Sequence, residues 1–361
     1  MGEEKGHARY LARFGAQALL RPVLLRLGVG DHALALSVHH VVSDGWSAAV
    51  LVRELTELYR AAATGKPAEL PALPVQYADF AAWQRQRLSG EAFEAELAWW
   101  RAQLSPLPPP LELPVDRPRG PSSSGRGSRL RFRLGGESSE RVRAFGRARG
   151  ATPFAVLMAA FQALLYRYTG QQDLTVGTPV AGRTRGEVEG LIGCFVNTLV
   201  VRGDLAGAPS FERLVARTAE RARGALAHQE VPFELLVEQL QPERELARTP
   251  LFQVVFGLQV ALPEPQGWLE GGLAVESWGA ETDTAKFDWT LMLAEGAEGF
   301  LGWLEYRSDL FEVASMGRLL GHLKTLLEGG LAEPGRAVSR LPLLTAAELE
   351  QLRAPRPAAA P

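Results

Sequence analysis

The sequence predicts an α/β protein of two lobes, each with a mixed sheet and flanking helices. Segments with strand-like and helix-like apolar spacing alternate along the chain, which is typical of this fold class. The 361 residues are also long for a single hydrophobic core. A stretch rich in proline, glycine and serine at 104–128 divides the chain. We interpret it as a surface linker, because such a connector is unusual inside one core.

The first predicted unit is a strand, a tight loop and a helix. In "HALALSVHH" (32–40), leucine and valine alternate with small residues, which favours a strand. The "SDG" that follows is a turn sequence. From Ser47 onward leucines recur at helical spacing, and the pattern stops at Gly65. Two adjacent histidines therefore lie where a strand enters a loop, which is a common position for active residues.

Beyond residue 128 the pattern predicts a second set of elements. "ATPFAVLMAAFQALLYRYTG" indicates a helix with Thr152 as N-cap, Pro153 at the first helical position and Gly170 at the end. Two further helices are predicted from "SFERLVARTAERARGALAHQ" and "SMGRLLGHLKTLLEGG". The predicted strands are "RLRFRL", "DLTVGTPVAG", "CFVNTLVVR", "LFQVVFGLQV", "FDWTLML" and "GFLGWLEYR".

Composition argues against several classes of function. The net charge of −2 gives no electrostatic signature of binding to nucleic acid or to an anionic membrane. Cys194 is the single cysteine, so no disulfide framework or cysteine metal cluster is available. The most apolar stretch, 154–166, is too short to span a bilayer, and the chain starts without an apolar signal core. We expect a cytoplasmic protein.

The paired histidines are the first candidates for chemistry. Neighbouring residues of a regular strand point to opposite faces, so one of His39 and His40 is expected to act while the other braces the loop. Asp44 has three open roles: to cap the next helix, to orient a histidine, or to pair with an arginine. Gly45 provides a backbone shape or a close approach. A metal site at His40 and Asp44 lacks further ligands at suitable spacing.

Several catalytic signatures are missing from the sequence. It contains no G-x-S-x-G elbow, no G-x-x-x-x-G-K-[ST] phosphate loop and no G-x-G-x-x-G dinucleotide fingerprint. What remains is an imidazole without an obvious protein nucleophile beside it. Such a site favours direct transfer between two bound substrates, with the histidine managing a proton.

The chain resembles the condensation domains of nonribosomal peptide synthetases. "HHVVSDGWS" is similar to their HHxxxDG signature, and four further motifs agree in order. They are "YADFAAW" (77–83), "IGCFVNTLVVR" (192–202), "HQEVPFE" (228–234) and "RELARTPLFQ" (244–253). Two upstream family motifs, S-x-A-Q-x-R and R-H-E-x-L-R, have no counterpart. On this resemblance we expect an N-terminally truncated domain.

The resemblance implies a fold of two chloramphenicol-acetyltransferase-like lobes in a V, with the site in a tunnel between them. Residues 1–115 would form the remainder of an incomplete N-terminal lobe with the HHxxxDG motif, and 116–345 the C-terminal lobe. Residues 346–361 would form a linker towards an adenylation domain. The implied reaction joins a donor aminoacyl or peptidyl thioester to the amine of an acceptor aminoacyl thioester.

The family also implies roles for individual residues. His40, the second histidine, would accept a proton from the attacking amine or position it, with His39 beside it. Asp44 would pair with the arginine of "GTPVAGR", which is Arg183. Gly45 would leave room for a pantetheine arm. Three further residues are placed along the substrate tunnel: Trp46, Ser47 and Asn197.

The implied partners are an upstream and a downstream peptidyl carrier domain, which bring the substrates on phosphopantetheine arms, and an adjacent adenylation domain. No cofactor or metal is expected to bind directly, and neither nucleic acid nor a membrane is expected as a partner. "SDGWS" and the run after it resemble the group of condensation domains that couple an L-configured donor. The alternatives are an epimerisation-type domain, a non-catalytic binding module and an inactive fragment, whereas a cyclisation domain would carry aspartates in place of the histidines.

Overall fold

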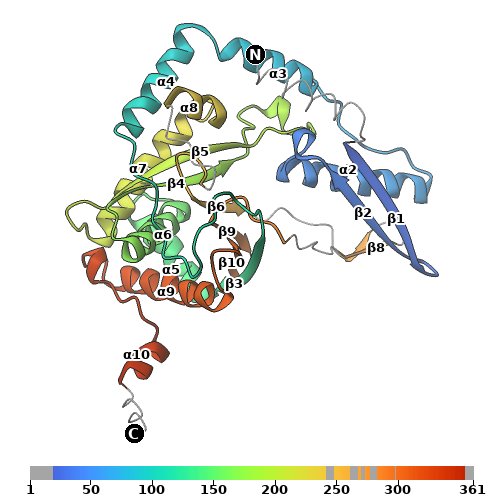
Figure 1. Cartoon of the computed structure of the whole chain (residues 1–361). Coiled ribbons are helices and arrows are strands. Elements are labelled where there is room, and N and C mark those ends of the chain that lie inside the picture. Colours follow the sequence, from blue (N-terminus) through green and yellow to red (C-terminus); the bar gives the residue numbers. More distant parts are fainter. Residues whose placement is uncertain are drawn as a thin grey trace. The chain divides into compact units, whose positions relative to one another are not determined.

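The computed structural model describes residues 19–240, 248–260, 267–269, 273–276, 283–296 and 298–353 (Figure 1). The chain groups into two compact units that interleave along the sequence. The first unit draws on 1–86, 181–196 and 262–278, and the second on 87–180, 197–261 and 279–361. The α/β fold class is confirmed. The division into continuous lobes at residue 115 stays a prediction, and both the start of the first lobe and the end of the tail lie outside the described residues.

The first unit contains a β-hairpin followed by a long helix. β1 (Leu20–Gly28) pairs antiparallel with β2 (Asp31–Val38). A short 3-10 helix, η1 (His40–Val42), comes next, and α2 (Gly45–Thr64) then ends at Gly65 in the left-handed conformation that glycine favours. The other elements are η2 (Gly186–Val188), the hairpin of β7 (Gly267–Leu269) and β8 (Leu273–Val275), and most of α3 (Tyr77–Arg87).

The second unit is built on a six-stranded mixed sheet in the order β3-β10-β9-β6-β4-β5. The neighbours of β6 run parallel to it, and the other pairs are antiparallel. The strands are β3 (Gly127–Leu134), β4 (Asp173–Val180), β5 (Asn197–Asp204), β6 (Val254–Val260), β9 (Trp289–Gly296) and β10 (Gly299–Arg307). All six predicted strands of this part are therefore present, with β5 starting three residues later than its motif.

Helices cover both faces of this sheet (Figure 1). On β6, Val254 and Phe256 join one apolar cluster while Val255 joins another, as the alternation of a strand requires. The first cluster includes α5 (Gly136–Ala148), α6 (Pro153–Thr169), α7 (Phe211–Ala227) and α9 (Val313–Ala332). The second includes α4 (Gly90–Leu104) and α8 (Phe233–Leu240). η3 (Val338–Arg340) and α10 (Ala346–Arg353) are the last elements of the described residues.

The central helix α6 follows the sequence pattern closely. The Thr152 side chain accepts a hydrogen bond from the backbone N–H of Ala155, Pro153 occupies the first position, and Gly170 ends the helix with φ of 74°. Every residue from Ala155 to Leu165 is buried. The predicted helix is confirmed with its caps, because these depend on local backbone chemistry alone.

The segment expected to be a surface linker, 104–128, is not one throughout. Leu111 and Leu113 are buried in the first cluster of the second unit. The backbone N–H of Asp116 donates to the Leu310 carbonyl at 2.9 Å. Arg119 forms an ion pair with buried Asp288 at 2.6 Å. Proline prevents helix and ladder formation but does not prevent apolar side chains from packing, so composition alone was misleading here.

Within the described residues, no helix by itself is long and apolar enough to cross a bilayer. Only α5 and α6 taken together reach the required length and apolarity, and they meet at a bend of 107°.

Candidate active site around the paired histidines

The two histidines lie just beyond the strand and not within it. β2 ends at Val38, His39 is the N-cap of η1, and His40 is the first residue of that helix. The expectation based on alternating strand faces therefore does not apply. Hydrogen bonds distinguish the two rings instead, since His39 Nδ1 accepts from the backbone N–H of Val41 at 3.1 Å. His39 thus closes the turn that presents its neighbour.

His40 is exposed and its ring is held by one nitrogen. Nδ1 lies 2.8 Å from the carbonyl oxygen of Ser43 and 3.9 Å from Sγ of Cys194. A carbonyl oxygen can only accept, so Nδ1 carries the proton in the neutral ring. Both contacts of the ring within the described part of the chain involve Nδ1. Nε2 is thereby left as a proton acceptor without a hydrogen-bond partner among the described residues.

Asp44 links two segments that are far apart in sequence. Its Oδ1 accepts from the backbone N–H of Ser47 at 2.8 Å, which caps α2, and its Oδ2 accepts from the backbone N–H of Phe195 at 2.9 Å. Nη2 of Arg183 lies 3.4 Å from Oδ1, so the expected ion pair is present. Burial by itself raises the pKa of Asp44, but these hydrogen bonds and the Arg183 charge outweigh burial and hold its pKa below the ordinary 3.8.

Arg183 is buried together with its partner: 1% of its side chain and 3% of that of Asp44 is exposed. The guanidinium donates to the carbonyls of Val188 and Leu191, and its centre lies 4.0 Å from the ring centroid of Phe195. Burial lowers the pKa of Arg183, which the Asp44 carboxylate opposes. Arginine nevertheless stays charged in proteins, so this is a buried ion pair.

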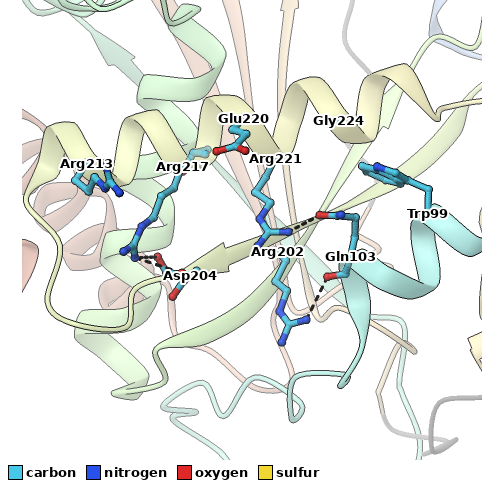
Figure 2. A pocket seen from close by; sticks show the side chains of 10 residues that line it. Trp99, Gln103, Arg202, Asp204, Arg213, Arg217, Glu220, Arg221 and Gly224 are labelled. Atoms are coloured by element: carbon cyan, nitrogen blue, oxygen red, sulfur yellow. Dashed lines mark hydrogen bonds and ion pairs between the residues drawn. The ribbon is translucent and has the colours of Figure 1, made fainter.

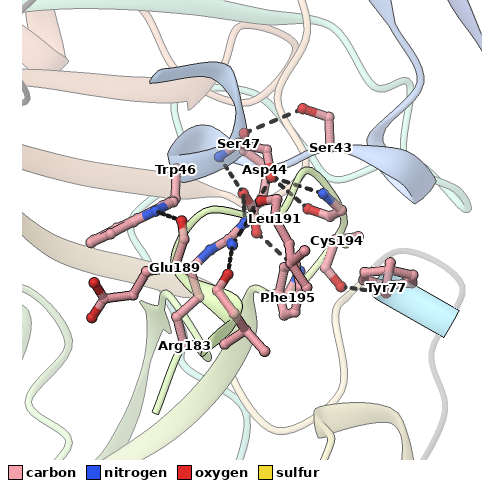
Figure 3. Close-up of polar contacts among 12 residues, drawn as sticks. Ser43, Asp44, Trp46, Ser47, Tyr77, Arg183, Glu189, Leu191, Cys194 and Phe195 are labelled. Atoms are coloured by element: carbon pink, nitrogen blue, oxygen red, sulfur yellow. Dashed lines mark hydrogen bonds and ion pairs between the residues drawn. The ribbon is translucent and has the colours of Figure 1, made fainter. Parts of the chain in front are cut away.

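Ser47 completes the network shown in Figure 3. Its hydroxyl donates to the Gly193 carbonyl at 2.7 Å and accepts from the Gly193 N–H at 3.1 Å and from Arg183 at 2.8 Å. Ser47 is completely buried. The structure gives it a bracing role that the sequence did not indicate, and its predicted place along the substrate tunnel stays a prediction.

Tyr77 and Cys194 are site residues that sequence reasoning missed. The Tyr77 hydroxyl donates to the Cys194 carbonyl at 2.8 Å, and its ring meets Phe195 edge-on at 5.0 Å. Both lie in recognised motifs, but nothing in the linear order indicates that they touch. Cys194 does not make a nucleophilic pair with His40 through Nδ1, because the Ser43 carbonyl at 2.8 Å already engages that nitrogen and Sγ makes only a long contact with it at 3.9 Å.

Gly45 and Trp46 begin α2 directly after the acid. Gly45 does not adopt the left-handed conformation, and a Cβ built on it would meet no atom within 4 Å. A special backbone shape therefore does not require glycine here, and the space beside Gly45 is open; close approach of another molecule stays a prediction. The Trp46 indole N–H donates to the Glu189 carbonyl at 2.9 Å, so this ring is fixed by the same loop as Arg183.

Asn197 belongs to the second unit, as the first residue of β5. Its Nδ2 donates to the carbonyls of Gln229 and Val231, and its Oδ1 accepts from the backbone N–H groups of Thr198 and Phe233. These bonds use the whole capacity of the side-chain amide in bracing the loop before α8. Its place along the substrate tunnel stays a prediction.

No group of three or more metal-binding side chains occurs among the residues that the structure describes. The site combines an exposed imidazole on a turn with a buried carboxylate, guanidinium and serine that join the start of α2 to the loop at 183–195. It can accept or position a proton on a bound substrate.

Comparison with known proteins identifies the family of the chain. The family model of the condensation domain matches residues 13–353. The chain is 48% identical over 328 residues to phosphinothricin tripeptide synthetase PhsB of Streptomyces viridochromogenes, covering 90% of this chain and 27% of that protein. It is 44% identical over 335 residues to one of the linear gramicidin synthase proteins of Brevibacillus parabrevis, covering 92% of this chain but only 7% of that synthase protein.

Solved structures lead to the same family. The X-domain of teicoplanin biosynthesis in its complex with OxyB superposes with a TM-score of 0.81 at 30% identity, over 91% of this chain and 73% of that chain. The first condensation domain of the calcium-dependent antibiotic synthetase, bound to a substrate analogue, gives 0.71 at 25% identity, over 94% and 75%. Condensation domains of these synthetases are amide-forming acyltransferases. From the family model, the sequence relatives and the fold together, the chain belongs to the condensation-domain family of nonribosomal peptide synthetases.

Proposed function

We propose that this chain forms a peptide bond between a donor aminoacyl or peptidyl thioester and the amine of an acceptor aminoacyl thioester. The observation that carries the proposal is the hydrogen bond of exposed His40, whose Nδ1 is engaged by the Ser43 carbonyl, so that Nε2 remains as the acceptor. Direct transfer requires a proton acceptor and no covalent intermediate on the protein, and the site offers that combination.

The reaction follows from this geometry. The acceptor amine attacks the donor carbonyl, a C–N bond forms, and the carbonyl oxygen becomes an oxyanion in a tetrahedral intermediate. His40 Nε2 takes the proton that the nitrogen must lose. When the C–S bond breaks, the thiolate leaves and takes up the proton. Because a free α-amino group has a pKa near ~8, positioning the amine contributes more than basicity.

The supporting residues keep His40 in place. Asp44 and Arg183 join α2 to the loop at 183–195, and His39 closes the turn. Open space beside Gly45 is consistent with passage of a pantetheine arm. We therefore assign His40 as the catalytic residue, Asp44, Arg183 and His39 as positioning residues, and Gly45 as the residue that sets access.

Carrier and adenylation domains are the proposed partners. The chain spans 7% of the gramicidin synthase protein and 27% of PhsB, so most of each relative lies outside the region of similarity. Both names denote synthetases of peptides, which supports substrates that arrive on phosphopantetheine arms of carrier domains. We further propose an L-configured donor and a cytoplasmic location.

A coupling assay tests the proposal. Purified chain is mixed with a donor-loaded and an acceptor-loaded carrier protein, and carrier-bound dipeptide is measured by mass spectrometry. His40→Ala is expected to abolish the dipeptide and to leave the melting transition unchanged. His32→Ala is the matched control, because His32 is an exposed histidine on β2, the strand that precedes the turn of His40. Undiminished coupling by His40→Ala would overturn the assignment.

The X-domain complex with OxyB favours a second candidate, recruitment of a protein partner, because the same fold is bound to another protein there. This candidate predicts a folded wild-type chain that yields no dipeptide with any loaded pair. Epimerisation predicts an inverted aminoacyl thioester without an amide, which chiral analysis of the released amino acid detects. A chain without a cooperative melting transition would indicate an inactive fragment.

A further inference from the structure

The second unit contains a cavity that the proposed reaction does not use. It has a volume of about 480 Å³, and residues of α4, β5 and α7 line it (Figure 2). This volume is in the range of sites for small molecules. None of the residues assigned above to catalysis, positioning or access lines it.

A row of arginines on α7 forms one wall. Arg213, Arg217 and Arg221 follow one another at four-residue spacing, so they lie on one face of the helix about 6 Å apart per step. Like charges at this spacing destabilise a helix. Arg202 of β5 adds a fourth guanidinium to the lining. Repulsion within this row destabilises α7 unless negatively charged groups lie close to the arginines.

The protein itself supplies only part of that charge. Arg202 is paired with Asp173 at 2.7 Å, and Arg217 with Asp204 at 3.3 Å. The other two guanidinium groups have no carboxylate partner in the described part of the chain. Arg221 donates to the side-chain carbonyl of Gln103, and Arg213 makes no side-chain hydrogen bond there.

Glu220 is the only carboxylate besides that of Asp204 among the residues lining the cavity, and it is exposed. It makes no ion pair with either of the two unpaired arginines among the described residues. The lining therefore keeps an excess of positive charge.

The opposite end of the cavity is aromatic. Trp99 of α4 lies there, stacked on His228 with ring centroids 4.1 Å apart. A Cβ on Gly224 would come within 2.8 Å of the Trp99 ring, so the glycine allows the indole to approach α7. The cavity thus combines cationic groups with an indole ring and with hydrogen-bonding groups of Gln103 and Thr218.

We propose that this cavity binds a small, free phosphorylated molecule of the diphosphate or nucleotide class. Guanidinium groups bind carboxylates and phosphates alike, but a phosphoryl group offers three acceptor oxygens and can engage several arginines at once. A diphosphate carries enough negative charge to pair with both Arg213 and Arg221, the two arginines without a carboxylate partner in the described part of the chain. The site lies outside the proposed reaction, so either proposal can fail without the other.

Titration calorimetry with the full chain tests this site. The probes are pyrophosphate and AMP, with citrate, sulfate and 4′-phosphopantetheine as comparisons, all at one ionic strength. The variants are Arg213→Gln and Arg221→Gln, because neither removes a carboxylate partner. Arg223→Gln is the matched control: it lies on the same helix, is exposed, does not line the cavity, and loses the same charge.

Pyrophosphate or AMP is expected to bind saturably, and each cavity variant to weaken it by about tenfold or more while the control binds as the wild type does. Three results would overturn the proposal. They are absence of saturable binding by both probes, equal binding of citrate or sulfate, and equal weakening by Arg223→Gln. Binding of 4′-phosphopantetheine alone would assign the cavity to a carrier arm and also refute a free ligand.

Discussion

Removal of the Asp44 carboxylate tests the network of hydrogen bonds and the ion pair that join α2 to the loop at 183–195. Asp44→Ala leaves Arg183 charged, 99% buried and without its counter-ion, and it removes the acceptor for two backbone N–H groups. Breaking a buried ion pair in this way costs about 3–5 kcal/mol. The lost helix cap is part of the same carboxylate and is not counted again. We expect the free energy of unfolding of the first unit to fall by about 4 kcal/mol.

Urea unfolding and hydrogen exchange together measure this loss. The amide of Phe195, which donates to Asp44, is expected to exchange much faster in the variant, whereas peptides from α6 in the second unit keep their protection. The variant Tyr77→Phe serves for comparison, because it removes one neutral hydrogen bond to the Cys194 carbonyl. We expect it to lower the free energy of unfolding by only about 1 kcal/mol.

A double-mutant cycle separates the buried charge from the other contacts. Asp44→Asn with Arg183→Met removes both charges, and we expect it to be more stable than Asp44→Asn alone, since no uncompensated ion remains buried. The reasoning is refuted if Asp44→Ala unfolds at the same urea concentration as the wild type with Phe195 still protected. A stable but inactive Asp44→Ala would instead give the carboxylate a direct part in the chemistry.

The remaining predictions concern access, capping and pH. Gly45→Leu is expected to lose coupling activity while its melting temperature is retained, because a side chain there meets open space; normal turnover would refute the access role. His39→Ala is expected to lower stability near η1 by about 1 kcal/mol, and His39→Asn to restore it, because asparagine also caps helices. The pKa of Asp44 is lowered in the folded state, so ionised Asp44 stabilises the fold above pH 3.8, and this stabilisation is lost as the pH falls through the pKa of the folded state. Unfolding measured as a function of acid pH should show this loss for the wild type and not for Asp44→Asn.

Local elements were predictable from the sequence because local chemistry determines them. The caps and the burial of α6 follow from Thr152, Pro153 and Gly170 around an apolar run. The failures occurred where the backbone leaves a regular pattern. The alternating strand ends at Val38, one residue before the histidines, and the proline-rich segment buries Leu111 although its composition indicated a solvated linker.

Residue order alone was enough for the α/β fold class and the family, since each depends on patterns along the chain. Folding in three dimensions established which ring nitrogen of His40 is hydrogen-bonded, that Ser47 and Tyr77 hold the loop beside Cys194, and that four arginines and Trp99 line one cavity. The reason is physical. Hydrogen bonds and charge pairs act over a few ångströms in space, whereas partners such as Asp44 and Phe195 are 151 residues apart along the chain.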